Sequence, residues 1–101
     1  MTEVERVEAI LREAIERKIA EGWRLAPDVF SNIKERKCCA LGALSLTDGW
    51  TSVWTGYANL LRITPMNAEH IADGFDAVGQ QRRPTDEWFA LGAKLRREYV
   101  K

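Results

Sequence analysis

The fold of this chain is decided by Tyr57-Ala58-Asn59-Leu60-Leu61-Arg62-Ile63-Thr64-Pro65-Met66-Asn67-Ala68-Glu69-His70-Ile71. The pattern is typical of two short helices joined by a tight turn, because Thr64 can cap the second helix and Pro65 suits its first position. Small or apolar residues stand where two crossed helices must touch, namely at Ala58, Leu61, Ile63, Ala68 and Ile71. The stretch therefore predicts a helix-turn-helix.

Two longer helices are predicted at the ends of the chain. In residues 2–21, Thr2 and Glu5 have the spacing of a capping box, and Gly22 is placed to end the helix. Its inward face is predicted to hold Val4, Val7, Leu11, Ala14, Ile15 and Ile19. Pairs of opposite charge lie on its outer face, Glu8 with Arg12 and Glu13 with Arg17. A last helix follows the capping residue Thr85, and we expect the first and last helices to pack together.

The middle of the chain is predicted to hold shorter helices. After Ala26-Pro27-Asp28 breaks the chain, a short helix is expected to use Val29, Phe30 and Ile33. The uncharged run from Cys38 to Leu46 favours a buried helix, because one isolated strand would have no pairing partner. We expect the helix that begins at Pro65 to end at Gly74.

Length and composition fit one domain with its own core. The chain has 101 residues, of which 46% are apolar, and it includes four Trp. A chain of this size buries about two-thirds of its unfolded surface. We therefore expect an all-α fold, a compact single-domain bundle of four to five helices over residues 1–101.

The charge balance bears on partners and location. Fifteen basic and fifteen acidic side chains give a formal net charge of zero, so the chain lacks the broad positive field of a non-specific nucleic-acid binder. No stretch has the roughly 20 apolar residues of a membrane span, and the first residues are not the charged-then-apolar pattern expected of a signal peptide. We expect a cytoplasmic protein without a membrane partner.

Catalytic and metal-binding signatures are weak in this sequence. Cys38 and Cys39 are adjacent, without the C-x-x-C spacing of a zinc or redox pair, and we expect them to be reduced and mostly buried. A reactive thiol, with its pKa lowered by Lys37, is the less favoured interpretation. The set Glu69, His70, Asp73 and Asp76 includes the one histidine and could hold a metal, but helix-end hydrogen bonding explains it equally well. No catalytic residue, metal site or cofactor is assigned, and we do not expect an enzyme.

The leading interpretation is a non-enzymatic module that binds a protein partner, either another protein or a second copy of this chain. Trp and Tyr dominate interface hot spots, and this chain carries an excess of Trp. The predicted surface consists of Trp50, Trp54 and Tyr57 with a charged rim of Arg82, Arg83, Arg96 and Arg97.

Two alternatives stay open. The first is a DNA-binding helix-turn-helix at residues 57–73, with Met66, Asn67 and His70 toward the bases. Against it, Arg62 stands where such turns usually have Gly, and Glu69 and Asp73 would repel phosphates. The second is a pocket between the 38–46 helix and the Gly74–Asp76 corner that binds a small anion through Arg82 or Arg83.

Three short motifs carry a resemblance to known sequences: Cys39-Ala40-Leu41-Gly42-Ala43-Leu44, Ile71-Ala72-Asp73-Gly74-Phe75-Asp76 and Leu91-Gly92-Ala93-Lys94-Leu95-Arg96. With these motifs, residues 38 to 97 resemble small uncharacterised helical proteins of bacteria and their phages. The resemblance implies a helical fold and carries no activity that could be transferred to a residue here.

Overall fold

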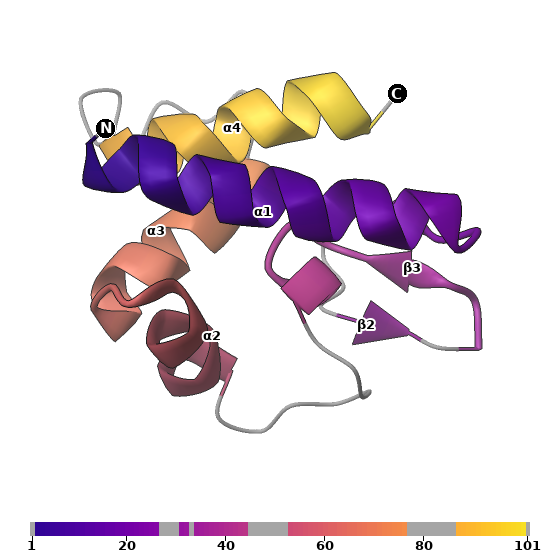
Figure 1. The fold of residues 1–101 in the computed structure, drawn as a ribbon, viewed down its shortest axis with the longest axis horizontal. Coiled ribbons are helices and arrows are strands. Elements are labelled where there is room, and N and C mark those ends of the chain that lie inside the picture. The colour runs from indigo at the N-terminus through magenta and orange to yellow at the C-terminus, as the bar shows by residue number, and fades with distance from the viewer. Residues whose placement is uncertain (1, 27–30, 33, 45–52, 77–86, 101) are drawn as a thin grey trace.

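The computed structural model describes residues 2–26, 31–32, 34–44, 53–76 and 87–100. Four α-helices lie in this part of the chain, with a 3₁₀ turn at Gly42–Leu44: α1 (Glu3–Ala20), α2 (Val53–Leu61), α3 (Pro65–Asp76) and α4 (Glu87–Tyr99). Figure 1 shows α4 running alongside α1 in the same direction, with α2 and α3 below their N-terminal halves. The mostly helical fold that the sequence predicts is confirmed.

The first helix begins and ends as its sequence predicts. Thr2 Oγ1 accepts a hydrogen bond from the Glu5 amide (3.1 Å), and the Thr2 amide donates to the Glu5 carboxylate (2.9 Å), which completes the capping box. At the other end Gly22 has a φ of +93°, and the Trp23 amide donates to the Lys18 carbonyl (2.9 Å). This is a Schellman motif, in which glycine takes the left-handed conformation at no steric cost.

One residue of the predicted inward face lies outside the core. Ile19 is 44% exposed, whereas Lys18 is buried in line with Val7, Leu11 and Ile15. The chain turns at Gly22 and places the Trp23 ring 4.3 Å from Lys18 Nζ. The prediction for Ile19 is therefore wrong because Trp23 covers the Lys18 side of the last turn, where a cation–π contact offsets the burial of the ammonium group.

Three two-residue strands form a small sheet that the all-α prediction lacked: β1 (Arg24–Leu25), β2 (Ser31–Asn32) and β3 (Lys37–Cys38). The middle strand, β3, pairs in parallel with β1 and antiparallel with β2. The helix predicted from Cys38 is wrong at its start, because Cys38 has strand partners on both sides. Of the described residues in that run, 38–44, only Gly42–Leu44 are helical, as a 3₁₀ segment. The short helix expected from Val29 to Ile33 is wrong at Ser31–Asn32, which form β2, while Val29, Phe30 and Ile33 themselves lie outside the described part of the chain.

Two glycines set the crossing of α3 and α4. A Cβ atom at Gly74 would overlap the carbonyl oxygen of Phe89, and one at Gly92 would overlap the carbonyl oxygen of Ile71. Each helix therefore packs directly against the backbone of the other. Gly74 does not end α3 as predicted, because it lies inside the helix where α4 needs a residue without a side chain, and α3 continues to Asp76.

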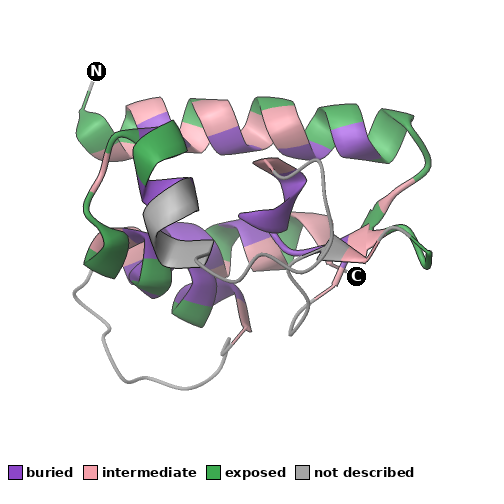
Figure 2. Ribbon diagram, turned by 90° about the horizontal axis from the view of Figure 1, so that it is seen from below, coloured by how far each residue is buried: buried purple, intermediate pink, exposed green. Residues whose placement is uncertain are grey.

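Most buried apolar residues of the described elements form one cluster, to which all four α-helices and the 38–43 segment contribute (Figure 2). A polar network on the surface joins α1 to α4. The Arg12 guanidinium binds Glu8 (2.8 Å) on its own helix and Glu98 (2.8 Å) on α4, and Tyr99 donates to Glu16 (3.1 Å). The expected packing of the first and last helices is confirmed, as are the ion pairs of Arg12 with Glu8 and of Arg17 with Glu13.

Candidate functional site at the α2–α3 corner

The predicted helix-turn-helix has well-defined geometry at its turn. Arg62 adopts a φ of +58° just after α2, and the Ile63 amide donates to the Ala58 carbonyl (3.0 Å). Thr64 Oγ1 then accepts a hydrogen bond from the Asn67 amide (3.2 Å), so Thr64 is the N-cap that the sequence predicts. A turn of three residues, Arg62–Thr64, thus joins two capped helices.

A side chain from α1 fixes this turn from outside. Arg6 donates to the carbonyl oxygens of Leu61 (2.9 Å) and Arg62 (3.4 Å). Carbonyl groups at a helix C-terminus have no amide partner within the helix, and a cation there interacts favourably with the helix dipole. Arg6 therefore holds the α2–α3 corner against the first helix.

The inward side of the corner follows the sequence prediction. Ala58, Leu61, Ala68 and Ile71 are buried, and Ile63 is half-buried against the core. The outward side carries two exposed apolar side chains, because Leu60 is 51% exposed and Met66 is 65% exposed.

Acidic side chains lie further along α3, after Met66. Glu69 and Asp73 are both exposed and stand one turn apart on α3, which contains no Lys or Arg. Like charges four residues apart destabilise an isolated helix, and no described cation forms an ion pair with either carboxylate.

The three residues of the DNA-binding alternative are not presented together. Met66 is exposed and Asn67 is half-buried, but His70 is only 7% exposed. His70 belongs to the inward side of α3 with Ala68 and Ile71, and its imidazole is therefore not displayed on the outer surface of that helix.

The aromatic surface predicted for partner binding loses one member to the core. Tyr57 is fully buried, since it shares the inward side of α2 with Ala58 and Leu61. Trp54 lies in the first turn of α2, with a side chain outside the described part of the structure. Trp50, Arg82 and Arg83 lie wholly outside that part.

The other two rim residues differ from each other. Arg96 is half-buried and donates to the Phe75 carbonyl (2.9 Å), so it ties α4 to the last turn of α3. Arg97 is exposed. Of the predicted rim, Arg96 therefore has a structural role in the helix pairing.

Both cysteines are buried free thiols, as the sequence predicts. Burial raises the pKa of Cys38 to about 11 and that of Cys39 to about 12, and the Gly42 amide donates to Cys39 Sγ (3.2 Å). Both thiols are therefore protonated at neutral pH. Within the described residues, no three His, Cys, Asp or Glu side chains gather as a metal site would require.

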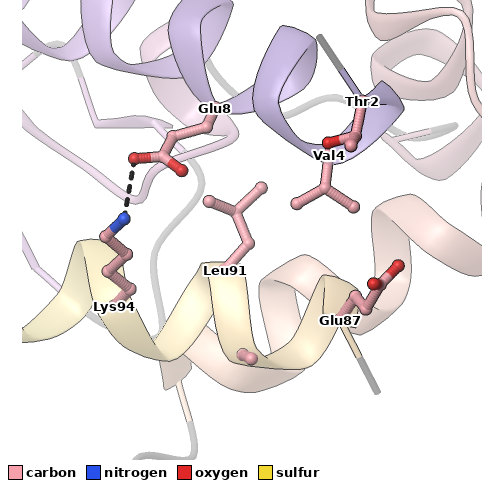
Figure 3. A pocket seen from close by; sticks show the side chains of 7 residues that line it. Thr2, Val4, Glu8, Glu87, Leu91 and Lys94 are labelled. Atoms are coloured by element: carbon pink, nitrogen blue, oxygen red, sulfur yellow. Dashed lines mark hydrogen bonds and ion pairs between the residues drawn. The ribbon is translucent and has the colours of Figure 1, made fainter. Parts of the chain in front are cut away.

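A shallow groove of about 320 Å³ lies between the N-terminal halves of α1 and α4 (Figure 3). Val4 and Leu91 form its apolar floor, and the ion pair of Glu8 with Lys94 (3.1 Å) closes one end. Hydrogen bonds from Arg12 and Lys94 lower the pKa of the Glu8 carboxyl. The groove differs from the predicted anion pocket, whose Arg82 and Arg83 lie outside the described ranges.

Comparison of the chain with protein-family models, curated proteins and solved structures found no match. Among the described residues, no helix is both long and apolar enough to cross a membrane.

Proposed function

We propose that this chain is a non-enzymatic helical module that binds a protein partner, either another protein or a second copy of this chain, through the α2–α3 corner. The observation that carries the proposal is the exposure of Leu60 (51%) and Met66 (65%) on either side of the same three-residue turn. Single exposed apolar residues are common, but two of them beside one turn form the start of an apolar contact surface.

The corner is also well suited to binding because it is held in place. The Arg6 hydrogen bonds, the Thr64 cap and the buried inward side chains fix the directions of α2 and α3. A surface that is ordered before binding loses less conformational entropy when its partner arrives.

The exposed carboxylates define the chemistry of the partner. Glu69 and Asp73 lie beyond Met66 on α3. A complementary protein surface would place an apolar side chain between Leu60 and Met66 and basic side chains against the two carboxylates.

Site-specific photocrosslinking tests this function. A photoreactive amino acid at position 66 is expected to capture one discrete protein in cells. The matched control is the same group at position 13, because Glu13 is exposed on the outer face of α1. Equal labelling from both positions, or no discrete product from position 66, would refute the proposal.

The geometry of the turn favours DNA binding as the second candidate. A capped second helix after a left-handed Arg62 is the backbone arrangement that helix-turn-helix proteins use. Under this candidate, duplex binding weakens with salt, weakens in Asn67→Ala, and tightens in Glu69→Gln because a carboxylate facing phosphate is removed. Fluorescence anisotropy with a labelled duplex separates the candidates, since the protein-binding proposal predicts no such response.

A further inference from the structure

A basic surface lies on the small sheet. Arg24 of β1 and Lys37 of β3 are register partners, so their side chains leave the sheet on the same face, opposite the buried Leu25 and Cys38. Like charges side by side on neighbouring strands are unfavourable within the chain. The exposed Lys34 and Arg36 lie in the adjoining turn, and we call these four residues the basic sheet surface.

Internal partners neutralise only part of this charge. Lys37 forms an ion pair with Glu35 (3.5 Å), and Arg36 donates to the Glu21 carbonyl (3.4 Å). Among the described residues, neither Arg24 nor Lys34 has an ion pair of this kind. Both side chains are exposed, and no described acidic residue forms an ion pair with them.

Beyond the turn, where Arg62 is an exposed cation, the outer face of α3 carries the opposite charge. Its acidic surface consists of Glu69 and Asp73, which also repel each other within the chain. Figure 1 places the corner at the lower left and the sheet at the right, along the longest axis of the molecule. Although the net charge of the chain is zero, positive charge therefore gathers at the sheet and negative charge on the outer face of α3.

Apolar exposure follows the same division. Among the described residues, three large apolar side chains are exposed: Ile19, Leu60 and Met66. Leu60 and Met66 belong to the corner, and Ile19 lies in the last turn of α1, directly before the sheet. Each of the two regions therefore combines exposed apolar atoms with a repulsive pair of like charges.

We propose that the partner of the α2–α3 corner is the basic sheet surface of a second copy of this chain. This inference rests on the proposed function and specifies the partner for the same site. In the contact, Glu69 and Asp73 lie against Arg24 and Lys34 of the other copy, and Leu60 and Met66 cover the region around Ile19. Opposite charges relieve the repulsion that each surface has in the isolated chain.

Sedimentation equilibrium of the purified chain tests this contact. At about 50 mM salt the weight-average mass is expected to rise with protein concentration, and at about 500 mM salt the association weakens roughly tenfold or more. Arg24→Glu/Lys34→Glu and Glu69→Lys/Asp73→Lys are each expected to be monomeric. Glu3→Lys/Glu13→Lys makes the same change in net charge as the second variant, at two residues of α1 that belong to neither charged surface, and should still associate.

Mixing the two monomeric variants gives the decisive result. The first variant keeps its acidic corner and the second keeps its basic sheet surface, so an equimolar mixture is expected to associate again. A monomeric wild-type chain at all concentrations, or a mixture that stays monomeric, would overturn the inference. If the chain is monomeric but position 66 still crosslinks to one different protein, only the self-association is overturned. If the chain is monomeric and position 66 gives no discrete crosslink, the proposed function is overturned too.

Discussion

Arg6 joins α1 to the end of α2 through one guanidinium group that binds two carbonyl oxygens. We expect Arg6→Ala to lower the free energy of unfolding by about 1–3 kcal/mol, because a charge-assisted hydrogen bond is lost and a part-buried carbonyl is left without its donor. Urea unfolding measures the change. Arg17→Ala is the control, since it removes an exposed ion pair on the same helix and should cost less than about 0.5 kcal/mol. Equal losses in the two variants would contradict the role given to Arg6.

Because both thiols are buried, the stability of the folded chain is expected to decrease at alkaline pH. Their pKa values in the folded chain, about 11 for Cys38 and about 12 for Cys39, lie above the ordinary value of 9.0 that applies after unfolding. Their contribution to stability is therefore complete below about pH 9 and is lost as the pH rises through the folded values. Between about pH 9 and 10.5 we expect each thiol to lower the unfolding free energy by up to about 1.4 kcal/mol per pH unit.

Thermal or urea unfolding at several pH values checks this dependence. Cys38→Ala/Cys39→Ala starts from lower stability but should show a flatter decline above pH 9. A decline as steep as that of the wild type would mean that other groups cause it.

Among the elements, the ends of α1 and the turn before α3 were predictable because local rules govern them. The Thr2 capping box, Gly22 and Thr64 each depend on residues within one helical turn. The sheet was not predictable, since strands of two residues show no alternation and β3 pairs with partners that carry no strand signal themselves. The continuation of α3 past Gly74 was not predictable for a related reason, because the role of Gly74 depends on its contact with α4.

The crossing of α3 and α4 leads to a prediction for Gly92. Gly92→Ala should lower the free energy of unfolding by about 1–3 kcal/mol or more, because the new Cβ overlaps the Ile71 carbonyl and forces the helices apart. Intrinsic helix propensity alone would favour alanine, so the sign of the change is diagnostic. Ala90→Gly, on the exposed side of the same helix, should instead destabilise by about 1 kcal/mol. A more stable Gly92→Ala chain would show that the helices do not pack backbone to backbone.

At the scale of the whole molecule, the candidate site was predictable in its backbone but not in its surface. The spacing of Ala58, Leu61, Ala68 and Ile71 specified which sides of α2 and α3 face the core. It could not assign Tyr57 to the surface or the core, because a Tyr is suited to either environment. The charge separation between the sheet and the corner depends on how distant segments are placed, and the sequence alone reports only its sum, which is zero.

A polar network centred on Arg12 joins the first and last helices, α1 and α4. Hydrogen bonds from Arg12 hold the pKa of Glu98 below its usual range and are the main cause of the lowered pKa of Glu8. Because these folded pKa values are lowered, the stability they provide is present above about pH 4.5 and is lost as the pH falls through the folded values. Arg12→Met should therefore lower the free energy of unfolding at neutral pH and low salt, with a smaller loss at high salt and at about pH 3. Urea unfolding across pH measures this, with Arg17→Met as the control because Arg17 pairs with the exposed Glu13 and not with Glu8 or Glu98. A loss for Arg12→Met that stays constant from neutral to acid pH would show that its methylene packing, and not its charge, joins α1 to α4.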